Sequence, residues 1–268
     1  MDARAEIGSG VHIGAFSVIE GEVTVEAEAV IGHHVVLEGR VVIGPRARIG
    51  HGSALGGVPQ DLKFKRGTPS GVRVGAGTRL REYVTIHRAT TPEGWTEVGA
   101  DCLLMTMCHV AHDCRLGDGV ILINYAGLTG HVDVGDKATV GGLTGVAPFT
   151  RIGTFAYVGG CSKVTADAPP YLIVNGIPAT ARGVNVVGLR RGGVAVTERR
   201  LLQDAYRILY RSGLSPARAL ETIRATLPAS PTLTTLVDFV ASARRGVCGP
   251  ARRSSSMTPE QDPGERVF

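Results

Sequence analysis

Five side chains capable of acid–base chemistry lie at related positions in the middle of the chain: His87, His109, His112, Asp113 and His131. A neutral histidine beside a carboxylate can act as a general base on a hydroxyl or an amine. Three histidines can instead hold zinc and leave one coordination position open. A third reading is that these are solvated polar side chains at outward positions. The spacing alone leaves all three readings open.

A six-residue repeat predicts the elements that position these residues. Every sixth residue is aliphatic over 7–55, 74–86 and 98–164, which makes 24 hexads. This period is neither the 3.6 of an amphipathic helix nor the 2 of one extended strand. It fits a short strand followed by a tight corner, where glycine relieves backbone strain. Three strands and three corners close a triangular coil of 18 residues.

The fold class predicted is therefore an all-β parallel β-helix of about eight coils, over residues 1–190. Residues 18 apart lie on successive coils, roughly 4.8 Å apart, so His131 should stack on Asp113. The repeat is interrupted by predicted loop insertions near 56–72 and 89–97. Excursions from a regular solenoid are where such folds place binding residues.

The period changes to helical spacing after the coils. We predict a small domain of three α-helices over 191–247, in which Ser215 and Pro216 serve as N-cap and first residue of the second helix. Residues 248–268 lack an apolar period and are predicted to form a disordered tail.

The composition restricts the class of protein further. The 37 Gly and the small number of aromatic residues (6 Phe, 6 Tyr, 1 Trp) fit a narrow repetitive fold. Five cysteines make a disulfide framework improbable, and Cys102, Cys108 and Cys114 occupy small inward positions of hexads. We find no signal peptide and no run of 18 apolar residues, which predicts a cytoplasmic protein without a membrane span.

The net charge of +5 is unevenly distributed. Residues 190–268 contain 13 Arg against 7 Asp and Glu. This surplus predicts an acidic partner, and no groove-reading motif points to nucleic acid. A solvated helical face would explain the surplus equally well.

Several motifs resemble one known family. They are Gln60-Asp61-Leu62-Lys63, Val84-Thr85-Ile86-His87-Arg88, His109-Val110-Ala111-His112-Asp113-Cys114, Gly130-His131-Val132 and Gly159-Gly160-Cys161-Ser162. In order and spacing they resemble the UDP-N-acetylglucosamine 3-O-acyltransferases of lipid A biosynthesis. The resemblance implies left-handed winding, a homotrimer with active sites between subunits, no metal or other cofactor, and an acidic acyl carrier protein that supplies the acyl thioester and docks beside the basic helices.

The resemblance also implies residue roles. His112 would be the general base on the sugar 3-hydroxyl, Asp113 would orient it, and the Gly130 N–H would hold the thioester oxygen. Gly160 falls at the position that sets acyl-chain length, where a missing side chain favours a longer hydroxyacyl group. Substrate binding would involve Gln60, Asp61, Lys63, His87, His109, His131, Asn185, Arg190 and Arg191.

The chain departs from the family pattern on the nucleotide and acyl side of this cleft. The departures are Ala147 and Pro148 for His-Gln, Pro178 for His, Val187 for Glu, and Gly192 for a basic residue. These departures leave two alternatives: the same chemistry on a modified UDP-amino sugar, or a paralogue that binds a nucleotide sugar without turnover. The histidine cluster leaves a third, a zinc hydratase of the γ-carbonic anhydrase type, in which the histidines would be metal ligands.

Overall fold

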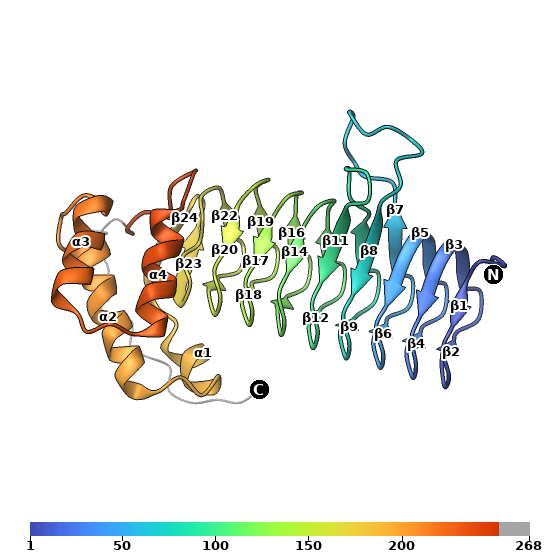
Figure 1. The fold of residues 1–268 in the computed structure, drawn as a ribbon, viewed down its shortest axis with the longest axis horizontal. Coiled ribbons are helices and arrows are strands. Elements are labelled where there is room, and N and C mark those ends of the chain that lie inside the picture. Colours follow the sequence, from blue (N-terminus) through green and yellow to red (C-terminus); the bar gives the residue numbers. More distant parts are fainter. Residues whose placement is uncertain (252–268) are drawn as a thin grey trace.

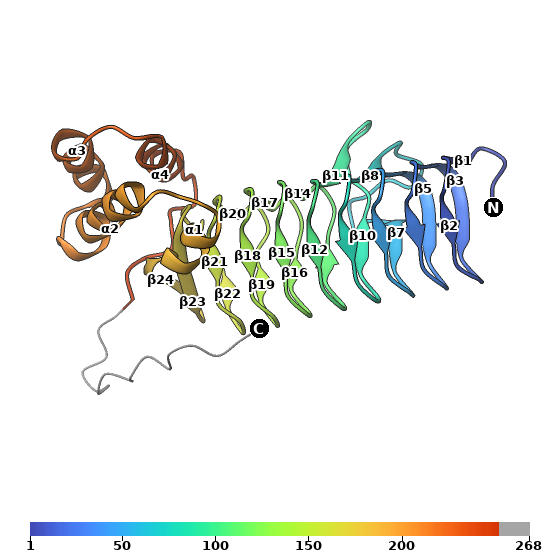
Figure 2. The same ribbon diagram turned by 90° about the horizontal axis from the view of Figure 1, so that it is seen from below.

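The computed structural model describes residues 1–251 and shows a three-walled parallel β-helix followed by a cluster of helices (Figure 1). Each of the 24 predicted hexads lies in one of the strands β1–β22, because β3 and β5 each span two hexads. The β-helix prediction is therefore confirmed. The turned view in Figure 2 shows the coils stacked side by side from the N-terminus to the helices.

The strands divide among three walls. The first wall contains β2 (His12–Ile13), β4 (Val30–Ile31), β6 (Arg48–Ile49), β9 (Arg79–Leu80), β12 (Leu103–Leu104), β15 (Ile121–Leu122), β18 (Thr139–Val140), β21 (Tyr157–Val158) and the hairpin β23 (Leu172–Gly176) with β24 (Ala179–Val184). The second contains β7 (Ala54–Gly57), β10 (Thr85–His87), β13 (His109–Val110), β16 (Gly127–Leu128), β19 (Gly145–Val146) and β22 (Lys163–Val164). The third contains β1 (Glu6–Ile7), β8 (Gly71–Val74), β11 (Trp95–Val98), β14 (Arg115–Leu116), β17 (Asp133–Val134) and β20 (Arg151–Ile152); β3 (Val18–Val25) and β5 (Val36–Ile43) run from the second wall into the third.

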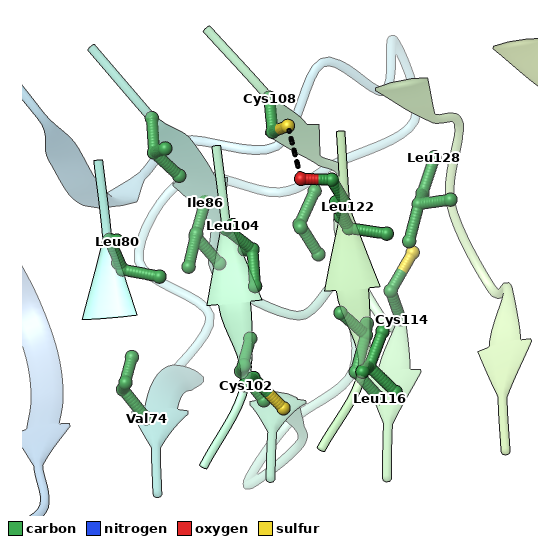
Figure 3. Packing of buried hydrophobic residues seen from close by; sticks show 14 of the residues in the cluster. Val74, Leu80, Ile86, Cys102, Leu104, Cys108, Cys114, Leu116, Leu122 and Leu128 are labelled. Atoms are coloured by element: carbon green, nitrogen blue, oxygen red, sulfur yellow. Dashed lines mark hydrogen bonds between the residues drawn. The ribbon is translucent and has the colours of Figure 1, made fainter. Parts of the chain in front are cut away.

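The core is a column of inward side chains along the coil axis (Figure 3). Leu104, Leu122 and Leu128 are completely buried, as is Cys108, whose thiol lies against the Leu122 carbonyl. Burial raises the pKa of Cys108 and Cys114 to about 11. These thiols stay protonated at neutral pH, so they fill the core, as the sequence predicted, and are poor nucleophiles.

Left-handed backbone conformations mark the corners of the coil. The His–Asp corner, between the second and third walls, holds Asp113, His131 and Phe149. The apolar corner, between the first and second walls, holds the exposed side chains of Tyr83, Met107, Tyr125 and Leu143. A long loop leaves the coil after β7 and projects from the solenoid (Figure 1).

The C-terminal region contains α1 (Val186–Arg191), α2 (Val196–Arg211), α3 (Pro216–Thr226) and α4 (Pro231–Ala241). The sequence analysis did not predict α1, which lies almost entirely within the range assigned to the β-helix and is too short to show a helical period. Ser215 caps α3 through the Arg218 N–H, as predicted. The sequence analysis placed 248–251 in the tail, but Cys248 is buried and Pro250 pairs with Ala181, so this stretch packs on the solenoid; 252–268 lie outside the described residues. Within 1–251, no helix is long and apolar enough to span a membrane.

Candidate active site

A histidine–aspartate pair lies at the centre of the His–Asp corner. His112 Nδ1 is 2.7 Å from Asp113 Oδ2, and His131 Nε2 is 3.5 Å from the same oxygen. Asp113 and His131 occupy equivalent corners of successive coils, so the predicted stacking is confirmed. The side chains of His112 and Asp113 are each 11% exposed, which shields the pair and still leaves it reachable.

Two threonines hold Asp113 in place. Thr90 donates its N–H to Asp113 Oδ1 at 3.1 Å and its hydroxyl to Oδ2 at 2.7 Å. Thr96 accepts the Asp113 N–H at 2.8 Å and is completely buried. Burial by itself would raise the pKa of Asp113, but the hydrogen bonds from Thr90 and His112 outweigh it and lower the pKa. Asp113 is therefore a carboxylate at neutral pH.

The donor atoms of His112, Asp113 and His131 also lie within 4.8 Å of one another, the kind of cluster that could hold a metal ion. However, Asp113 Oδ2 already accepts from the Thr90 hydroxyl and faces His112 Nδ1. A metal ion would have to displace these partners. The geometry favours a carboxylate that orients an imidazole.

Two further histidines lie on the second wall next to this pair. The Thr85 hydroxyl is 2.7 Å from His109 Nδ1, and the rings of His87 and His109 meet edge to face with centroids 4.9 Å apart. Burial lowers the pKa of His87 to about 4 and also lowers that of His109. Both are therefore neutral at neutral pH. Neutral imidazoles suit hydrogen bonding to a polar substrate better than charge stabilisation.

Gly130 brings the backbone against the His112 ring. Its φ is +109°, and a Cβ there would lie 2.9 Å from His112 Cε1 and 3.0 Å from Nε2. Only glycine permits both the conformation and this approach. The Gly130 N–H also interacts with the Cys114 thiol, whose pKa it lowers against the larger effect of burial.

Phe149 extends the site by one more coil. Its ring stacks on His131 with centroids 4.4 Å apart and planes within 8°. The preceding carbonyl, of Pro148, accepts a hydrogen bond from Arg245, which follows α4. Phe149 lies 18 residues after His131, so the coil period could have located it. Thr90 lies 23 residues before Asp113, a separation that is not the 18 residues of one coil because the insertion lies between them, so the coil period could not locate it.

The other predicted substrate-binding residues are not joined to this cluster by any contact found within residues 1–251. Gln60, Asp61 and Lys63 lie in the projecting loop, where Asp61 accepts the Lys63 N–H at 2.9 Å and the intervening Leu62 is fully exposed. Asn185 caps α1 through the Gly188 N–H and donates to the Phe155 carbonyl. The loop leaves the solenoid between β7 and β8, on the same corner line as Asp113.

Three other predicted positions lie at the surface. Arg190 and Arg191 are exposed on α1. Gly160 is exposed at the apolar corner, where a Cβ would lie 3.2 Å from the Gly142 carbonyl oxygen.

A cleft of about 1100 Å³ lies among β3, β5 and the projecting loop and is lined in part by Glu38 and Arg88, but His112 is not in its lining. His112 and Asp113 therefore lie at a corner of the solenoid outside this cleft.

The chain is similar to known acyltransferases in both of its regions. Residues 167–248 match a family model described as "Udp N-acetylglucosamine O-acyltransferase; Domain 2", and residues 4–39 match "Bacterial transferase hexapeptide (six repeats)". A Burkholderia orbicola protein named acyl-[acyl-carrier-protein]--UDP-N-acetylglucosamine O-acyltransferase is 40% identical over 200 residues, which cover 73% of this chain and 76% of that protein. A Burkholderia mallei protein of the same name is 41% identical over equal coverage.

Solved structures agree with the sequence matches. LpxA from Bacteroides fragilis, a UDP-N-acetylglucosamine acyltransferase, has a TM-score of 0.89 at 35% identity, covering 92% of this chain and 96% of that one. The Francisella novicida UDP-N-acetylglucosamine acyltransferase has a TM-score of 0.90 at 34% identity, covering 93% and 91%. Fold and site together define a hexapeptide-repeat acyltransferase with a left-handed β-helix. The chain belongs to the UDP-N-acetylglucosamine O-acyltransferase family.

Proposed function

We propose that this protein transfers a 3-hydroxy fatty acyl group from acyl carrier protein to the 3-hydroxyl of UDP-N-acetylglucosamine, in lipid A biosynthesis. Its relatives are named for acyl carrier protein as donor and UDP-N-acetylglucosamine as acceptor, and we carry both over to this chain. The observation that carries the proposal is the 2.7 Å contact between His112 Nδ1 and Asp113 Oδ2 on an open corner of the solenoid.

Each group at the corner has one role in this reaction. Asp113 accepts the Nδ1 proton of His112, so the Nε2 lone pair is free to take the proton of the sugar 3-hydroxyl. The sugar oxygen then bonds to the thioester carbonyl carbon, and the Gly130 N–H donates to the oxyanion. As the intermediate collapses, the carbon–sulfur bond breaks and the His112 proton passes to the departing thiolate. No covalent enzyme intermediate and no metal or other cofactor is required.

In a homotrimer, neighbouring copies of the chain would enclose the His–Asp corner. The exposed Tyr83, Met107, Tyr125 and Leu143 of the apolar corner form an apolar edge beside the wall that carries His109. Residues of this kind are typical of a subunit contact. In such a trimer Gln60, Asp61 and Lys63, and separately Asn185, Arg190 and Arg191, would complete a neighbouring site.

The basic surface of the helices supports docking of the acidic carrier protein. Of the four arginines on α2, Arg200, Arg207 and Arg211 are exposed; Arg207 pairs with Asp204, and Arg199 is partly buried. We expect Arg200→Gln with Arg211→Gln to raise the KM for the acyl carrier protein several-fold and to weaken its salt dependence, with kcat unchanged. Initial rates at several salt concentrations measure this. Arg48→Gln with Arg79→Gln removes the same charge from the first wall and should change neither quantity; an unchanged KM in the α2 variant would contradict the docking surface.

Mass spectrometry of the products tests the proposed function directly. Purified protein is supplied with a mixture of acyl carrier protein donors and several UDP-sugars. We expect one O-acylated product of UDP-N-acetylglucosamine with a long 3-hydroxyacyl chain, because Gly160 has no side chain to shorten a groove. If the enzyme prefers a modified UDP-amino sugar, the family differences at Ala147 and Pro148 would determine which acceptor it uses. Binding of UDP-sugars without any product would overturn the proposal in favour of a non-catalytic paralogue, and zinc-dependent hydration would do so in favour of the hydratase.

A further inference from the structure

The insertion that interrupts the hexads between β10 and β11 contacts the His–Asp corner at both of its ends. Thr90, near its start, donates two hydrogen bonds to the Asp113 carboxylate. Thr96, in β11 at its end, accepts the Asp113 N–H. The Asp113 backbone is in the left-handed region, with φ of 59°, which is uncommon for a residue with a side chain. The two ends of the insertion therefore hold Asp113 in place at the corner.

We propose that Thr90 is a positioning residue of the acyltransferase, which holds Asp113 so that its Oδ2 faces His112 Nδ1. The inference rests on the proposed function. The Thr90 N–H occupies Oδ1 and its hydroxyl occupies Oδ2, each within 3.1 Å. These bonds stop the carboxylate from rotating, so the His112 ring keeps one orientation and one tautomer.

The fold of the insertion does not depend on the Thr90 hydroxyl. The Ser70 hydroxyl donates to the Ala89 carbonyl at 2.6 Å, and Arg40 pairs with Glu93 at 2.6 Å. The Arg40 and Arg73 guanidiniums both lie over the Trp95 ring, 4.5 and 3.7 Å from its centroid. Because these contacts remain when one hydroxyl is removed, the effect of that removal can be assigned to Asp113.

The test compares Thr90→Val with Thr90→Ser in acyl transfer. Valine keeps the shape and removes the hydroxyl, so we expect kcat to fall on the order of 10-fold with KM unchanged. Serine restores the hydroxyl and should recover most of kcat. The matched control is Thr106→Val, because the Thr106 hydroxyl also donates to a carboxylate, that of Glu82, at 3.0 Å. A Thr90→Val enzyme with the kcat of the wild type would overturn the proposal.

The proton that His112 Nδ1 shares with Asp113 supplies a second measurement, which needs no turnover. Without the Thr90 hydroxyl the Asp113 carboxylate is free to rotate, so its hydrogen bond with His112 Nδ1 weakens and the strongly downfield proton resonance of this N–H moves upfield or broadens. Proton NMR of wild type and Thr90→Val measures this change, which Thr106→Val should lack. An unchanged resonance overturns the positioning role, whereas absent transfer by wild type overturns only the proposed function.

Discussion

The substitution His112→Ala is expected to slow acyl transfer by roughly 10²- to 10⁴-fold, because a general base contributes about that much. The substrate would keep the proposed binding residues His87 and His109, and its hydroxyl would lose the atom that takes its proton. KM for the nucleotide sugar should change little. Single-turnover rates with acyl carrier protein donor and UDP-N-acetylglucosamine measure the effect.

The control for His112→Ala is His12→Ala, which removes an exposed imidazole from the first coil wall, far from the site. Thermal unfolding of both variants checks that the solenoid is intact. Retention of more than about a tenth of the wild-type rate by His112→Ala would rule out the base assignment. In that case the hydroxyl must be activated by another group at the corner, with His131 the next to test.

The regular part of the fold and the centre of the site could be predicted from one number, the period of six. A residue in a regular coil has only two variables, its wall and its height along the axis, and both follow from sequence position. That is why His131 was correctly placed on Asp113. The same arithmetic reaches Phe149, whose ring stacks on His131.

Prediction failed where the chain leaves the coil, since insertions have no period. Thr90 is such a residue: its two bonds to Asp113 depend on how the insertion folds back. The cap that Asn185 forms on α1 was likewise not predicted, because that contact is set by local helix geometry. The packing of Cys248 against the coil was also missed, because residues 248–251 depend on contacts with the distant residues Asp167 and Ala181.

The second large effect is expected at Gly130. In Gly130→Ala the new methyl would lie 2.9 Å from His112 Cε1, which is closer than such contacts allow. Either the backbone or the His112 ring must move, and rotation of the ring away from Asp113 costs less than a shift of the backbone. We therefore expect kcat to fall roughly 100-fold or more, since misplacing a catalytic group by about 1 Å can cost that much.

Backbone strain alone would also destabilise this variant, so the control must share the strain and lack the clash. Gly176 has a φ of +112°, and a Cβ there would meet the Arg182 guanidinium and the Pro178 carbonyl oxygen at an ordinary 3.4 Å. Gly176→Ala should therefore lose roughly 1–3 kcal/mol of folding free energy, the cost of a sparsely populated backbone region, and keep its rate. Urea unfolding and kcat of the two variants separate the effects. If Gly130→Ala unfolds like Gly176→Ala and turns over like wild type, the ring of His112 is free to move during catalysis, and its contact with Asp113 does not limit the rate.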